Sequence, residues 1–86
     1  MRVVMAGPRV RSHRHALPRG IRGRLARALR RERLAAGWKQ IELASRAGLH
    51  ERHIRRLEAG GENPTLETLE HLAKALGVDV IELLTK

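Results

Sequence analysis

Apolar residues recur along most of this chain at the three- and four-residue spacing of amphipathic α-helices, and glycines stand where that spacing is interrupted. The stripes predict five helices, over about residues 21–36, 40–47, 51–59, 66–76 and a last short stretch after Asp79. No strand candidate is longer than Val3-Val4, and no repeat of 20–50 residues is present. The pattern therefore predicts an all-α fold.

The segment from Gln40 to Glu58 organises the rest of the chain, because it has the pattern of two short helices around one glycine, Gly48. Apolar residues at helical spacing come before the glycine and resume after it: Ile41, Leu43, Ala44 and Ala47, then Leu49, His53, Ile54 and Leu57. Arg52, Arg55 and Arg56 are left on the other face of the second helix. A helix, a turn that needs a left-handed residue and a helix with one cationic face predict a helix-turn-helix.

Two residues near the end of the first predicted helix need an explanation. Arg33 falls in its apolar stripe, where a cation needs a buried partner or a route to water. Trp38, the single aromatic residue, follows Gly37, and we expect it to plug the junction of the first two helices rather than to stack on a base. Farther on, Thr65 is a good N-cap, and Asp79 with Glu82 has capping-box spacing.

Size and composition exclude several classes of protein. A chain of 86 residues, 42% of them apolar, makes at most one domain with a small core, which is too little for an enzyme with a deep cleft. The absence of cysteine excludes disulfides and thiolate metal sites. No apolar run approaches the roughly 20 residues needed to cross a bilayer. We therefore expect a cytoplasmic, nucleoid-associated protein without enzymatic activity, cofactor or metal.

The charge is placed unevenly along the chain. Residues 1–39 carry eleven arginines and one lysine against a single glutamate, whereas residues 40–86 carry six cations against eight acids. A polyanion is the natural partner of a chain whose positive charge is concentrated in its N-terminal half. The excess of arginine over lysine has two equally weighted explanations, the recognition of phosphates or a GC-rich genome.

Residues 1–20 contain glycine, proline and five arginines but no sustained helical stripe, and we expect a flexible basic arm. Such an arm either lies along phosphates or enters a minor groove, or it is only a solvated leader. Under the first hypothesis its DNA contacts come from Arg9, Arg11, Arg14 and Arg19. The pair His13 and His15 is not expected to bind metal, because nothing rigid would hold the imidazoles.

The helix expected over residues 51–59 is the candidate recognition helix, whose side chains would contact the bases of DNA. Arginine can donate two hydrogen bonds to guanine O6 and N7, and glutamate can accept one from cytosine N4. Glu51 and Arg55 are also four residues apart in the order that favours pairing along a helix. A plain solvated charged face is the remaining alternative for this segment.

A family resemblance rests on motifs spread over about three quarters of the chain. They are the segment Gly37-Trp38-Lys39-Gln40, the helix-turn-helix around Gly48, the Glu58-x-Gly60-x-x-x-Pro64 loop, and the run from Leu72 to Val78. With these motifs the chain resembles the Cro and lambda-type repressor helix-turn-helix family, also called the XRE family. The resemblance implies a compact five-helix bundle over residues 21–86 that binds double-stranded DNA as a homodimer on a two-fold operator.

The resemblance also implies roles for individual residues. Those expected to read bases are Glu51, Arg52 and Arg56, and those expected at the DNA backbone are Gln40, His50, Arg55 and Asn63. Arg33 and Glu58 match a partly buried structural ion pair. His50 stands where the family usually has serine or threonine as the N-cap of the recognition helix, and its ring can accept a backbone proton only when it is neutral.

We therefore expect a sequence-specific DNA-binding transcriptional regulator, with repression as its mode, that reads the major groove with its third helix. The alternative is an antitoxin or adaptor module of the same fold that acts through a protein partner, either a toxin or a co-regulator. For a dimer, the expected contact is the last helix through Leu83 and Leu84, which end the chain with little left to cover them.

Overall fold

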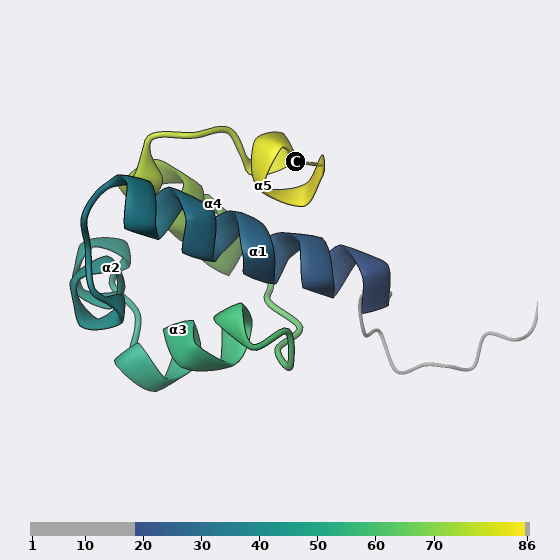
Figure 1. Ribbon diagram of the computed structural model, residues 1–86, viewed down its shortest axis with the longest axis horizontal. Helices are drawn as coiled ribbons and strands as arrows, with labels where there is room; N and C mark the ends of the chain where they lie inside the picture. Colours follow the sequence, from purple (N-terminus) through teal and green to yellow (C-terminus); the bar gives the residue numbers. More distant parts are fainter. Residues whose placement is uncertain (1–18, 86) are drawn as a thin grey trace, which may run out of the picture.

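Five α-helices follow one another through residues 19–85, the part of the chain that the computed structural model describes (Figure 1). They are α1 (Arg19–Ala35), α2 (Gln40–Ala47), α3 (Glu51–Glu58), α4 (Leu66–Leu76) and α5 (Val80–Thr85). The expected all-α fold is confirmed. Helix α1 begins two residues before the expected Ile21, a difference of the size by which helix ends commonly vary. None of the described helices combines the length and apolarity needed to cross a membrane.

The turn between α2 and α3 has the left-handed residue that the sequence pattern requires. Gly48 has φ 72°, and after it the Leu49 N–H donates to the Ala44 carbonyl at 2.8 Å. A residue with a Cβ would be strained at this φ, whereas glycine adopts it freely. The turn therefore brings α3 back across α2 and leaves one side of α3 open to solvent.

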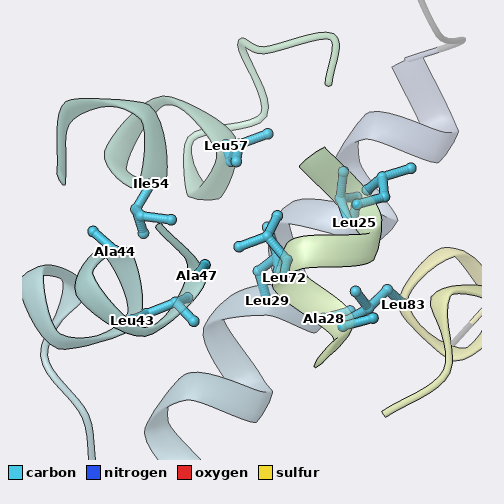
Figure 2. Packing of buried hydrophobic residues seen from close by; sticks show 12 residues of the cluster. Leu25, Ala28, Leu29, Leu43, Ala44, Ala47, Ile54, Leu57, Leu72 and Leu83 are labelled. Atoms are coloured by element: carbon cyan, nitrogen blue, oxygen red, sulfur yellow. The ribbon is translucent and has the colours of Figure 1, made fainter. Parts of the chain in front are cut away.

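The apolar stripes of all five helices meet in one core (Figure 2). Its largest fully buried side chains are Leu25, Leu29, Leu43, Ile54, Leu57, Leu72 and Leu83. Helix α1 crosses the middle of the molecule, with α5 on one side and α3 on the other (Figure 1). The orientation of α3 is thus determined by what it packs against on α1 and α2.

The expectation that Leu83 is a dimer contact is wrong. This side chain is only 1% exposed and packs beside Ala28 of α1 (Figure 2). Helix α5 folds back onto α1. Leu83 is therefore buried by the first helix of the chain, which the order of residues alone does not place next to it. Leu84 is half-buried, and the residue that α5 leaves in solvent is Ile81, at 66% exposure.

Trp38 has the structural role expected of it. It is half-buried and packs against the core just before α2 begins. The guanidinium of Arg46 lies over its ring, 4.3 Å from the centroid, which is within the range of a cation–π contact. One face of the ring is thus covered by Arg46, and part of the side chain is buried against the core.

A buried ion pair fastens α1 to α3. Arg33 Nε donates to Glu58 Oε2 at 2.6 Å and Arg33 Nη2 donates to Glu58 Oε1 at 3.0 Å, while Nη1 donates to the Trp38 carbonyl at 2.8 Å. Their side chains are 9% and 4% exposed. The hydrogen bonds to Glu58 raise the pKa of Arg33 above its usual value, against the opposing effect of burial. Glu58 is therefore the buried partner that Arg33 needs because of its position in the apolar stripe.

Replacing Arg33 with methionine is expected to lower the free energy of unfolding by about 3–5 kcal/mol, because it leaves the Glu58 carboxylate buried without its cation. The double variant Arg33→Met/Glu58→Leu is expected to recover most of that loss, since an apolar pair needs no water. Urea denaturation followed by circular dichroism gives both values.

The neighbouring pair of Arg31 and Glu32 is the matched control, because its side chains are 47% and 31% exposed. Arg31→Met should change the free energy of unfolding by less than about 1 kcal/mol. Equal effects of Arg31→Met and Arg33→Met would show that the buried pair does not fasten the helices.

Candidate nucleic-acid interface

Helix α3 begins with a histidine cap. His50 has an extended backbone, with φ −79° and ψ 144°, and its Nδ1 accepts a hydrogen bond from the Arg52 backbone N–H at 3.1 Å. Only an unprotonated Nδ1 can accept, so the neutral ring carries its proton on Nε2. The cap that the family usually makes with a hydroxyl is therefore made here by an imidazole, and the exposed His50 ring keeps one donor free of this bond.

The two sides of α3 differ sharply. Ile54 and Leu57 are 0% and 1% exposed and hold one side in the core, while Arg52 and Arg56 are exposed on the other. In residues 19–85 neither of these two arginines is paired with an acidic side chain. Arg52 and Arg56, together with His50 and His53, line a shallow hollow of about 270 Å³. Two unpaired guanidinium groups in one hollow on a helix surface can donate several hydrogen bonds to an anionic or electron-rich ligand.

Glu51 and Arg55 form the ion pair that their spacing favours. Arg55 Nη1 lies 3.1 Å from Glu51 Oε2, and the side chains are 54% and 38% exposed. The pair therefore exists in the free chain. Because a guanidinium has five N–H donors and this contact uses one nitrogen, Arg55 can still donate to a second acceptor.

His53 belongs to the same surface, although its spacing assigned it to the apolar stripe. It is half-buried, lines the hollow beside Arg52 and Arg56, and its Nε2 lies 3.5 Å from Glu62 Oε2. The available signal was that position 53 follows His50 by three residues and precedes Arg56 by three, so all three share one side of a helix.

Gln40 lies at the first turn of α2 and is attached to the buried ion pair. Its Nε2 donates to Glu58 Oε1 at 3.1 Å. The amide has a second N–H and a carbonyl oxygen besides this bond. The start of α2 and the end of α3 are thereby linked through one carboxylate, which places Gln40 beside the end of α3.

Some of the residues expected to contact DNA lie within the described part of the chain, and others lie outside it. Arg55 and Asn63 are exposed, one on α3 and one in the loop that follows. The expected arm residues Arg9, Arg11 and Arg14 lie outside residues 19–85, as do His13 and His15, and Arg19 is the first residue of α1.

Comparisons with known proteins agree on this architecture. The sequence model of a helix-turn-helix family matches residues 29–83. An HTH-type transcriptional regulator, y4dJ of Sinorhizobium fredii, is 46% identical over 57 residues, which cover 66% of this chain and 70% of that protein.

Two solved structures are similar to the chain. The hypothetical transcription factor NHTF from Neisseria has a TM-score of 0.73 and 34% identity, over 80% of each chain. The restriction-modification controller protein C.Esp1396I, as a tetramer in complex with its natural 35-base-pair operator, has a TM-score of 0.67 and 25% identity, over 77% of this chain and 96% of that one.

The local sequence, the turn at Gly48, the ion pair between α1 and α3 and the extent of the family match all lead to one assignment. The chain belongs to the helix-turn-helix family of the Cro and lambda-repressor type.

Proposed function

We propose that the chain is a sequence-specific, DNA-binding transcriptional regulator that inserts α3 into the major groove. The observation that carries the proposal is the pair of exposed, unpaired arginines, Arg52 and Arg56, on a helix whose opposite side is buried. The major groove is wide enough to admit an α-helix, and arginine is the side chain that most often identifies guanine there. The related C.Esp1396I, in complex with its operator, supports the proposal.

Base recognition is assigned to Arg52, Arg56 and Glu51. The two arginines can each make a bidentate contact with guanine without first breaking an ion pair. Glu51 must exchange Arg55 for cytosine N4, so its contribution to discrimination is the difference between two contacts. Specificity therefore rests mainly on the arginines.

Contacts with the sugar–phosphate backbone are assigned to Gln40, His50, Arg55 and Asn63. Each lies at the start of a helix, on the exposed side of α3 or in the loop after it. Such contacts set the register of α3 on the duplex and carry no sequence information of their own. Arg9, Arg11, Arg14 and Arg19 would add phosphate contacts from the N-terminal side.

Selection of random duplexes by the purified protein should yield a preferred site. Arg52→Ala and Arg56→Ala should each reduce discrimination between that site and its single-base variants by about 1–3 kcal/mol, because a bidentate contact is lost. Gln40→Ala should weaken the binding of all sequences alike. If both arginine variants select the wild-type site with unchanged preference, α3 does not read it through these residues.

His50→Asn separates capping from phosphate contact. Asparagine is as good an N-cap as a hydroxyl residue, so the free energy of unfolding should stay within about 0.5 kcal/mol of the wild-type value. Asparagine keeps an N–H donor, but its side chain is shorter than that of histidine and does not reach where the imidazole Nε2–H points. Affinity for every duplex should therefore fall by a common factor in fluorescence-anisotropy titrations. Unchanged affinity would restrict His50 to the cap.

We also propose that the chain acts as a homodimer through α5. With Leu83 in the core, the apolar side chain that α5 offers is Ile81, with the half-buried Leu84 beside it. Exposed apolar side chains on one side of a helix are well placed for a two-fold contact, in which the same patch serves both copies.

Ile81→Glu should weaken self-association at least about tenfold in sedimentation equilibrium, because a carboxylate would be desolvated at the contact. The matched control is Ile41→Glu, since Ile41 is 55% exposed on α2, away from α5. A dimer that survives Ile81→Glu as well as Ile41→Glu is formed by another surface.

A further inference from the structure

Helix α1 carries a second cationic surface that the proposed base reading does not use. Seven of its seventeen residues are arginine, against one glutamate, and its first turn contains no acid. Four of the arginines are exposed and follow one another around the outer face of the helix: Arg24, Arg27, Arg30 and Arg31. We call these four residues the α1 arginine face.

The α1 arginine face is scarcely neutralised by the rest of the chain. In residues 19–85 its one ion pair is the exposed contact of Arg31 with its neighbour Glu32, at 3.5 Å. Like charges three and four residues apart on a helix repel one another, as Arg24 and Arg27 or Arg27 and Arg31 do. Cations near the N-terminus of a helix also oppose its dipole. A bound polyanion would remove both penalties, whereas water alone only screens them.

This face points in a different direction from the recognition surface. The buried side of α1 holds Leu25, Ala28 and Leu29, and α5 and α3 pack along its flanks. The outer face of α1 is turned away from α4 and the core (Figure 1). Arg33 marks the side of α1 that faces α3, because it binds Glu58 there. At 3.6 residues per turn, Arg24, Arg27 and Arg31 lie on the side of α1 away from Arg33, so a duplex seated on α3 leaves them free for another ligand.

The side chains on this face identify the ligand as double-stranded. Binding of single strands relies on aromatic platforms for the bases, and Trp38, the single aromatic residue of the chain, is half-buried under Arg46. A protein partner would need an apolar centre, but the exposed residues between Arg24 and Arg31 are all arginine, and the exposed Leu34 lies one turn beyond them, at the end of the face and not at its centre. Guanidinium groups alone, repeated along a straight helix, suit the regularly spaced phosphates of a duplex.

We propose that the α1 arginine face binds the phosphate backbone of a second DNA duplex without sequence preference, so that one protein molecule bridges two duplexes. The proposal rests on the proposed function for the first duplex, held by α3. The second contact is electrostatic, forms through released counterions and weakens steeply with salt.

A sandwich assay with the full-length protein tests the bridge. A biotinylated duplex that contains the selected site is held on beads, protein is added, and a fluorescent duplex of unrelated sequence is offered at low salt. Wild-type protein should retain the fluorescent duplex. Arg24→Gln/Arg27→Gln/Arg31→Gln should retain at least about tenfold less, because three phosphate contacts are lost. Glutamine keeps the helix propensity of arginine, and circular dichroism verifies the fold.

A matched control removes the same charge from another part of the sequence. Lys39→Gln/Arg46→Gln/Lys74→Gln lowers the net charge by the same three units at exposed positions outside α1 that have no assigned DNA contact. It should still bridge the two duplexes. Equal loss of bridging in the two triple variants would reduce the effect to net charge and overturn the assignment to α1.

Two further measurements separate the remaining outcomes. The α1 triple variant should bind the single selected duplex within about threefold of wild type, whereas Arg52→Ala/Arg56→Ala should lose its preference for that duplex. Loss of single-duplex affinity in the α1 variant would place the arginines on the same duplex and contradict the bridge. A single-stranded competitor that displaces the fluorescent duplex better than a double-stranded one would contradict the duplex assignment. Failure of wild-type protein to bind any duplex would instead refute the proposed function.

Discussion

The arrangement of the whole interface depends on one carboxylate. Glu58, at the end of α3, accepts hydrogen bonds from Arg33 of α1 and from Gln40 of α2, so three helices are joined at a single buried group. Removing two charges from water costs free energy that their attraction largely offsets, so such a pair adds little net stability. It does fix geometry, because a bidentate contact tolerates only a narrow range of orientations.

That constraint explains how a helix of eight residues can be presented rigidly. A helix as short as α3 is unstable by itself, because nucleation costs more than so few hydrogen bonds return. Here its first turn is capped by His50, its middle is held by Ile54 and Leu57 in the core, and its end is tied through Glu58. Local and tertiary contacts thus leave the arginine side free to meet a ligand without further ordering of the backbone.

Positive and negative side chains are concentrated on different helices. Cations dominate α1 and the exposed side of α3, whereas the described acids of α4 and α5 are Glu67, Glu70 and Glu82, with Lys74 as the one cation. A molecule with this asymmetry turns its cationic sides toward DNA before contact. The same asymmetry gives a bundle of this size two cationic directions, one on α3 and one on α1.

The sequence by itself determined the features that depend on local physics. The helical stripes, the left-handed turn at Gly48 and the cap at Thr65 follow from spacing and backbone preference, so the five helices and the helix-turn-helix were predictable. The solvent-facing position of Arg52 and Arg56 followed from the same periodicity. The link between Arg33 and Glu58, 25 positions apart, came from the family resemblance, because spacing cannot specify a contact at that distance. Only the tertiary structure decided that Leu83 is buried and that His53 lies near Glu62 of the following loop, because each depends on which segment lies opposite. The pairing of Glu51 with Arg55 was one of two contacts that the spacing within α3 permitted, and the structure shows which one forms.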